Sequence, residues 1–322
     1  AWLALFTFPL MSIVQEMCAR IGMATGRGLA KNINQEYSKI VLYGVTLLLL
    51  IANTFNLGAD LGAMSKAVQL IVPGVPFVVA IGALTIISLG LQIFVSYSLY
   101  AKYLKYLSFV LLLYVAAAFV IPGLDWETIF PSLQFSRDSL FLICAILGTT
   151  ISPYLFFWQT SQEVEDRHLA DGAEAKLHHS RLRHHDLTQK DVKKMRTDVW
   201  LGMFLSNAVM FFIIVTCGAT LFPEGIAVTS AESAATALRP IAGQQAYILF
   251  ALGIIGTGLL AVPVLAGSAA YALAETFGWK GGLYKKLKHA HAFYGVIIIA
   301  MVAGMLMNFT GLDPIKALIY SA

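Results

Sequence analysis

Long runs of hydrophobic residues make up most of this chain, and short polar connections separate them. A transmembrane helix needs about 20 consecutive, mostly apolar residues, and most of the runs approach this length. A ninth run begins at about residue 312. The pattern predicts an all-α polytopic membrane protein with about eight full transmembrane helices visible. The complete runs lie near residues 1–18, 40–57, 75–97, 106–121, 139–158, 199–221, 246–273 and 293–309.

Composition supports a membrane protein and gives no indication of an enzyme. Hydrophobic residues make up 58% of the 322 residues, charged residues only 12%, and the mean hydropathy is +0.74. A soluble domain averages about 25% charged residues. No Walker, HExxH or GxSxG motif is present, and no GxGxxG follows a strand. We therefore expect no enzyme activity, no cofactor and no nucleic-acid partner. Free thiols are expected at Cys18, Cys144 and Cys217.

Lysine and arginine are concentrated in alternate connections, since eighteen of the 22 lie in four of them. Basic connections face the cytoplasm in most membrane proteins. We therefore expect the loops near 20–39, 98–106, 159–198 and 275–292 to be cytoplasmic. The protein would be a multi-pass component of the cell (plasma or inner) membrane, and its first visible run would cross from outside to inside.

The connection at 159–198 is the one sizeable polar segment, and it is predicted to be a cytoplasmic loop with some helix near its end. Its five histidines raise the alternative of a metal sensor. However, the pairs His178-His179 and His184-His185 fit no standard zinc pattern with cysteine or carboxylate. A solvated loop beside the membrane is therefore the favoured interpretation, and its basic residues would also suit anionic lipid headgroups.

The strongest functional signal is a helix-breaking patch from Gly148 to Tyr154, inside the run at 139–158. Unwound backbone at membrane depth survives only where it lines a cavity or is buried in protein. Secondary transporters use such discontinuous helices to present carbonyl and hydroxyl oxygens to a cation. The alternative is a simple kink, because glycine and proline are both common in membrane helices.

Polar residues inside the runs are few, and each is costly enough to be a functional candidate. Glu16 precedes Arg20 by four residues, which suits an ion pair on one helix face, so a structural role competes with a transport role. Asn53, Asn56 and Asp60 recur at helical spacing. This polar stripe must face a pore or another polar helix, and we favour the pore.

Two further patterns concern the packing around the patch. Ser152, Gln159 and Glu163 share one face of the segment after the break, which would extend a polar path toward the cytoplasm, although Glu163 also fits the wet end of a helix. The stretch from Gly253 to Ala270 is rich in small residues, which allow membrane helices to approach closely.

Six short motifs are spread along the chain: Phe6-Thr7-Phe8-Pro9-Leu10, Gln15-Glu16, Ala19-Arg20-Ile21-Gly22, Thr25-Gly26-Arg27-Gly28, Gly148 to Gln159 and Gly311-Leu312-Asp313-Pro314. Together they resemble the NRAMP family of divalent metal transporters, over essentially the whole chain. The resemblance implies an inverted repeat of five plus five helices, of the leucine-transporter type, in which helices one and six are unwound. The first visible run resembles the second helix of the family. The first helix, with its Asp-Pro motif, and most of the tenth would lie outside this sequence, making it a single transporter domain (1–322) truncated at both ends.

Departures from the family pattern bear on the substrate. Iron and manganese carriers of the family have Met-Pro-His where this chain has Ser152-Pro153-Tyr154. A thioether selects soft transition metals, whereas a hydroxyl is a hard ligand, so the chain is most similar to the NRAMP-related branch with magnesium and manganese carriers. An acidic residue of the family is replaced by Ala63, three positions after Asp60. With Tyr154 in place of histidine, proton coupling is in doubt.

The sequence therefore predicts a carrier that moves divalent cations (Mn²⁺/Mg²⁺-like) by alternating access, in the bilayer, as a monomer or weak oligomer. The resemblance implies metal ligands at Thr149 (carbonyl) and Ser152 (hydroxyl). The alternatives are a cation channel and a sodium-coupled symporter of amino acids or other organic solutes on the same fold. Along the transport path we expect Asn56, Asp60, Tyr154 and Gln159.

Overall fold

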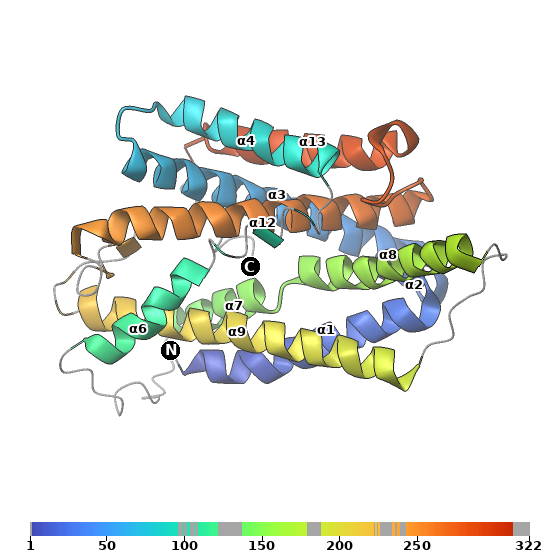
Figure 1. Ribbon diagram of the computed structural model, residues 1–322, viewed down its shortest axis with the longest axis horizontal. Coiled ribbons are helices and arrows are strands. Elements are labelled where there is room, and N and C mark those ends of the chain that lie inside the picture. Colours follow the sequence, from blue (N-terminus) through green and yellow to red (C-terminus); the bar gives the residue numbers. More distant parts are fainter. Residues whose placement is uncertain are drawn as a thin grey trace.

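The computed structural model describes residues 2–95, 109–121, 137–178, 188–221 and 243–311, together with a few single residues between these ranges. Its helices lie side by side along the longest axis of the molecule (Figure 1). The predicted run from residue 312 falls outside the described residues, as does most of the predicted loop at 98–106.

The described part of the chain is helical and contains no strand, which confirms the all-α prediction. Within the described ranges, five helices are long and apolar enough to cross a membrane: α1, α3, α4, α9 and α12. The inverted repeat stays a prediction. The helices are α1 Leu3–Thr25, α2 Leu29–Glu36, α3 Lys39–Ile71, α4 Phe77–Phe94, η1 Phe109–Leu112, α6 Leu113–Val120, α7 Arg137–Thr150, α8 Pro153–His178, α9 Gln189–Leu221, η3 Gly243–Gln245, α12 Ala246–Phe277, η4 Leu287–His289 and α13 His291–Met307.

Several helices differ in length from the predicted runs. The predicted run 40–57 is part of α3, which continues to Ile71. Residues 58–71 contain no proline that would interrupt the helix. Much of the predicted loop 159–198 is helical, since α8 continues to His178 and α9 already begins at Gln189. The segment of α8 beyond the apolar run contains several Glu, Gln and Ala residues, which have high helix propensity. The run at 106–121 contains η1 and the short α6.

The long helices pack in two groups. In the first, α3 packs along α12 and α13, and α4 covers α3 and α13. In the second, α1 packs between α8 and α9, and α8 also contacts α12, which joins the groups. The largest cluster of buried apolar side chains lies mainly in the first group and includes Leu57, Leu61, Ile81, Phe293 and Ile297.

Small residues allow the closest helix contacts, as predicted for the stretch around Gly267. A Cβ atom on Gly267 would lie 2.5 Å from the indole ring of Trp158, so this glycine admits α8 against α12. At the crossing of α3 and α13, a Cβ on Gly304 would lie 2.9 Å from the backbone nitrogen of Gly58. The same crossing is fixed by Asn308, whose Nδ2 donates to the Gly58 carbonyl over 2.8 Å.

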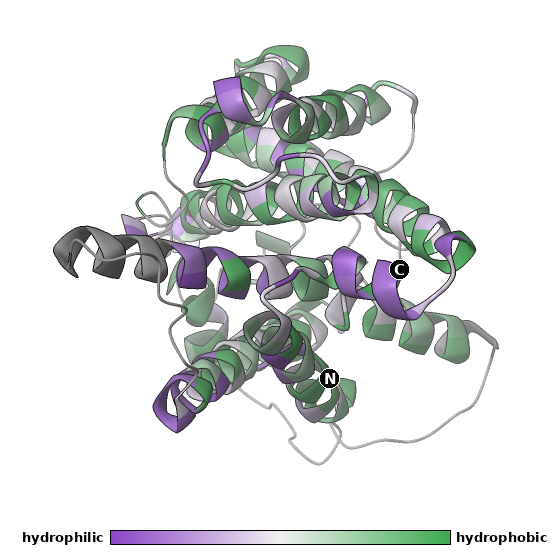
Figure 2. Ribbon diagram, turned by 90° about the vertical axis from the view of Figure 1, so that its right-hand side faces the viewer, coloured by the Kyte–Doolittle hydropathy of each residue, from purple (hydrophilic) through white to green (hydrophobic). Residues whose placement is uncertain are grey.

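Hydrophobic side chains cover the outer faces of the helices, as on α4, where Val78 and Ile86 are 62% and 71% exposed. Figure 2 looks at the end of the molecule where α2 lies, and hydrophilic segments gather there while the helices behind are largely hydrophobic. An apolar belt between polar ends is the surface expected of a protein in a bilayer. The architecture is that of a multi-pass membrane protein.

Candidate metal-binding cavity at the helix break

The predicted helix break is present between α7, which ends at Thr150, and α8, which begins at Pro153. Ile151 and Ser152 lie between them outside the helices. Pro153 has no backbone N–H. The carbonyl of Thr149, four residues earlier, therefore receives no helical hydrogen bond from residue 153. The hydroxyl of Ser152 donates to this carbonyl over 2.6 Å instead. The patch is therefore an interruption of the helix and not only a kink.

The two predicted metal ligands thus lie against each other. Ser152 is 3% exposed, and its proton points at the Thr149 carbonyl. A hydroxyl that donates one hydrogen bond keeps its lone pairs, and a carbonyl oxygen has two. Both oxygens therefore retain capacity to coordinate a cation. The Thr149 hydroxyl is not part of this arrangement, because it donates to the Ala145 carbonyl over 2.8 Å within α7.

A cavity of about 780 Å³ opens between the break, α3 and α12. Five of the six residues predicted for the ligand set and the transport path line it, and most of the remaining wall is apolar. Burial of a few oxygen donors in an apolar wall suits selective binding of a small ligand. The wall consists of Val45, Leu48, Leu49, Ala52, Asn53, Asn56, Asp60, Gly148, Thr149, Ile151, Ser152, Pro153, Tyr154, Ala261 and Leu265.

Of the described residues that line this wall, Asp60 is the one with an acidic side chain. It is paired with no basic side chain among the described residues, and it lies one helical turn beyond Asn56 on α3. Tyr154, at the start of α8, interacts with the side chain of Ser152 and lies within electrostatic reach of Asp60. The fold thereby places the acid of α3 opposite the broken segment.

The polar residues of the α3 stripe face two parts of the structure, the neighbouring helix α12 and the cavity. Asn53 turns toward α12, where its Nδ2 donates to the Leu265 carbonyl over 2.9 Å and to the Ser268 hydroxyl over 2.8 Å. Asn56 and Asp60 line the cavity, and Asn53 also borders it. The contacts of Asn53 fit the predicted polar neighbouring helix. The favoured pore stays a prediction for Asn56 and Asp60.

Gln159 is the predicted path residue that does not line this cavity. Its Oε1 accepts from Gln15 of α1 over 3.2 Å, and its Nε2 donates to Glu163 over 2.8 Å. The side chain therefore lies in a polar row between α1 and α8, away from Ser152. A role for Gln159 on an inner exit path stays a prediction.

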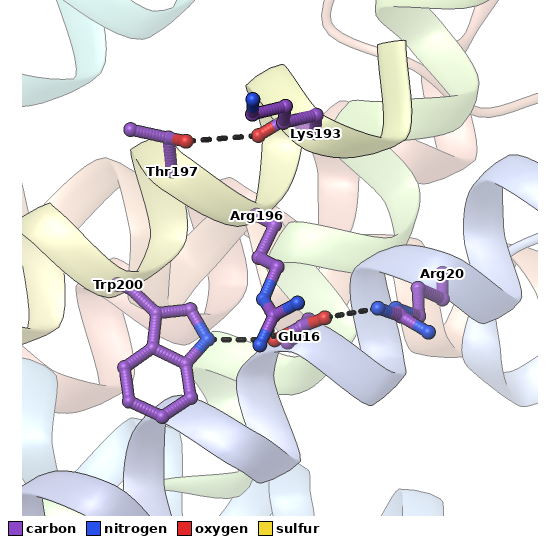
Figure 3. A network of polar contacts seen from close by, with 6 residues as sticks. All are labelled: Glu16, Arg20, Lys193, Arg196, Thr197 and Trp200. Atoms are coloured by element: carbon purple, nitrogen blue, oxygen red, sulfur yellow. Dashed lines mark hydrogen bonds and ion pairs between the residues drawn. The ribbon is translucent and has the colours of Figure 1, made fainter. Parts of the chain in front are cut away.

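Glu16 lies in the predicted contact with Arg20, at 2.5 Å, and is 8% exposed. Its other carboxylate oxygen accepts from the Trp200 indole over 2.6 Å and lies 3.5 Å from Arg196, both of α9 (Figure 3). These contacts tie α1 to α9, which supports the structural alternative for Glu16.

Sequence reasoning did not single out Glu165 and Tyr271, which bond to each other where α8 meets α12. Glu165 also accepts from the backbone N–H of Leu283 over 2.8 Å. Glu165 lies on the polar part of α8, beyond the apolar run. Burial raises the pKa of its carboxyl, and the hydrogen bonds from Tyr271 and the backbone oppose that rise. No local pattern signals this pair, because its members are far apart in sequence.

The histidines form no metal site within the described residues. No three His, Cys, Asp or Glu side chains come together there, and His168 is exposed. His179, His184 and His185 of the predicted loop lie outside the described residues, so the sensor alternative has no support from the part of the chain that is described.

The whole chain, residues 1–322, matches the family model described as natural resistance-associated macrophage protein-like, or Nramp. This chain belongs to the Nramp family. The resemblance carried by the motifs at Gln15-Glu16 and Gly148 to Gln159 is thereby confirmed. The assignment also agrees with the expectation of a protein that is not an enzyme.

Two curated relatives agree with this assignment. The chain is 26% identical over 317 residues to a divalent metal cation transporter MntH of Aeromonas hydrophila, covering 93% of this chain and 71% of the relative. It is 25% identical over 277 residues to a divalent metal cation transporter MntH of Yersinia enterocolitica, covering 80% of this chain and 60% of the relative.

Proposed function

We propose that this chain acts in the transport of divalent metal cations across a membrane, with the cavity at the α7–α8 break as the substrate site. The observation that carries the proposal is the convergence of Asn56, Asp60, Thr149, Ser152 and Tyr154 on one cavity in an otherwise apolar bundle. Membership of the Nramp family and the names of its two relatives support the same function.

In this proposal the Thr149 carbonyl and the Ser152 hydroxyl bind the ion, and Asp60 supplies negative charge nearby. All three donors are hard oxygen ligands, which suit magnesium and manganese better than soft metals. A single carboxylate on the wall leaves part of a divalent charge to be balanced by carbonyl dipoles. Substrates of the Mn²⁺/Mg²⁺ class are therefore the expected cargo.

The packing suits alternating access. The cavity lies between α3 and α12 of one helix group and the broken segment, whose α8 packs on α1 of the other. A shift of one group relative to the other would move Ser152 away from Asp60 and open the site to one side. Carriers commonly rock one bundle against another around a fixed site near the membrane centre.

Orientation follows from the placement of basic residues. The C-terminal ends of α1, α8 and α12 and the N-terminal ends of α3, α9 and α13 lie at the same end of the molecule (Figure 1). The segments that join these helix ends in the sequence hold most of the lysines and arginines. We propose that this end faces the cytoplasm, in a cell membrane, and that the protein acts as a monomer or weak oligomer.

Uptake by proteoliposomes that contain the purified chain tests the function. We expect saturable uptake of Mn²⁺ and Mg²⁺ that falls strongly in Ser152→Ala, because this variant loses one ligand and the hydrogen bond to Thr149. A single-channel current would support a channel instead. Sodium-driven uptake of an amino acid without metal uptake would support the symporter alternative.

A further inference from the structure

The connection between α12 and α13, residues 278–290, carries a concentrated positive surface, which we call the lysine loop. Four lysines, one histidine and a tyrosine surround an open concavity of about 780 Å³ at the polar end of the molecule. They are Lys280, Tyr284, Lys285, Lys286, Lys288 and His289.

Carboxylates do not neutralise this surface in the described structure. Glu165 and Glu275 line an adjoining cavity of about 220 Å³, but both are engaged elsewhere. Glu165 bonds to Tyr271 and to the loop backbone. Glu275 accepts from the backbone N–H of Lys31 over 3.1 Å and contacts Ser161. The lysines of the loop form no ion pair with any described carboxylate, so their charge is available to an external anion.

The backbone that carries the lysines is held in place from two sides. Glu165 of α8 accepts from the N–H of Leu283, and Tyr294 of α13 donates to the carbonyl of Lys285 over 2.8 Å. Gly282 has φ +126°, a conformation that L side chains rarely adopt, and it allows the chain to turn between these anchors. The lysines are thus presented on a fixed backbone, which lowers the entropy cost of binding a ligand.

Aromatic side chains place the loop at the edge of the membrane. Tyr43, Phe277 and Trp279 form a continuous stack, with ring centroids 6.1 Å and 5.1 Å apart, and all three are exposed. Aromatic belts of this kind lie at the level of lipid headgroups. The neighbouring Lys285 side chain lies over the Tyr284 ring at 5.1 Å. A positive surface beside an aromatic belt fits the phosphate of a lipid better than an acidic protein in solution.

We propose that the lysine loop binds the headgroup phosphate of anionic phospholipids in the leaflet at this end of the molecule. Lys280, Lys285, Lys286 and Lys288 supply the charge, and Trp279 contacts the upper acyl region of the bilayer. The site rests on the proposed membrane orientation but not on the identity of the transported ion, so lipid binding and metal uptake can fail independently.

Native mass spectrometry of the purified chain in detergent, titrated with phosphatidylglycerol or phosphatidylcholine, tests the proposal. We expect preferential retention of phosphatidylglycerol, reduced at least about fivefold in the triple variant Lys285→Gln, Lys286→Gln, Lys288→Gln, because each lysine near an anionic surface adds to binding. The matched control, Lys190→Gln, Lys193→Gln, Lys194→Gln, removes the same charge from the same end of the molecule and should retain the preference.

A charge-preserving triple variant separates loss of charge from loss of folding. We expect the protein with Lys285→Arg, Lys286→Arg and Lys288→Arg to bind phosphatidylglycerol as the unmodified chain does. Equal loss in both glutamine variants, or none in the loop variant, would overturn the proposal. Complete displacement of the lipid by millimolar inorganic phosphate would also overturn it, because the site would then be one for a free anion.

Discussion

The hydroxyl of Ser152 donates a hydrogen bond to the carbonyl of Thr149 over 2.6 Å, at the position where Pro153 offers no backbone N–H. The serine thereby stabilises the break between α7 and α8 while keeping oxygen lone pairs for a cation. In the proposed site, two tasks would therefore fall on this one side chain: holding the unwound backbone and binding the ion.

Ser152→Met should shift preference toward cadmium and away from magnesium, because a thioether is a soft donor. A change of about tenfold in the cadmium-to-magnesium uptake ratio corresponds to about 1.4 kcal/mol in relative binding. Competition uptake in vesicles measures it. The control is Ser206→Met, at an exposed serine of α9 outside the cavity. An unchanged ratio would count against Ser152 facing the ion.

Metal flux should occur with weak or no movement of protons. The family pattern has an acidic residue and a histidine that could relay protons, and this chain has Ala63 and Tyr154 at those positions. A pH dye inside proteoliposomes should stay flat while metal enters. The double variant Ala63→Glu, Tyr154→His should introduce a proton signal that follows metal uptake. If the unmodified chain acidifies the vesicles in proportion to metal, Asp60 becomes the first residue to test.

The double variant Gly148→Ala, Pro153→Ala should favour a continuous helix, because alanine has the best helix propensity, whereas glycine and proline have the worst. The Thr149 carbonyl would then accept from the new N–H at 153 and lose its place in the site. We expect transport to fall strongly while the protein still inserts and purifies. Normal transport would show that the break is not the site.

A matched control for that variant is Pro9→Ala with Gly202→Ala. Pro9 lies inside α1, and a Cβ on Gly202 of α9 would meet nothing within 4 Å. The control makes the same two substitutions in membrane helices away from the cavity, so it should transport like the unmodified chain.

Glu16→Gln should destabilise the contact between α1 and α9 by about 1–3 kcal/mol, because hydrogen bonds to a charged group stabilise a protein more than hydrogen bonds between neutral groups do. Trp200→Phe removes a single hydrogen-bond donor to the same carboxylate and should therefore reduce the stability by a smaller amount. Thermal unfolding in detergent measures both. Glu36→Gln, at an exposed residue of α2, should leave the unfolding midpoint unchanged. Metal selectivity should be the same in all three variants, and altered selectivity in Glu16→Gln would instead favour a transport role.

Stability should depend on pH through Glu165. Burial raises the pKa of this carboxyl in the folded protein, so folding favours its neutral form. Its contribution to the free energy of unfolding is therefore fully present below the unfolded pKa, about 4.3, and is lost as pH rises through the folded pKa. Glu165→Gln, which is neutral at every pH and still accepts from Leu283, should show a smaller loss of stability over that pH window. Identical pH profiles of the unfolding midpoint would contradict this assignment.

The sequence by itself determined the features that depend on local chemistry. Apolar runs of spanning length predicted the membrane class, and Gly148 with Pro153 predicted the break, because both residues act on their own backbone. Glu16 and Arg20 were paired correctly, since four residues on a helix always bring side chains together.

Only the tertiary structure decided which polar groups meet. Asn53, Gln159 and Glu16 find partners on other helices, at Ser268, Gln15 and Trp200. These contacts depend on the rotation of each helix about its axis and on where small residues such as Gly267 allow close approach. In a chain that is apolar on nearly all faces, periodicity does not fix that rotation. Gln159 therefore turned toward α1, while Asp60 came to face the break.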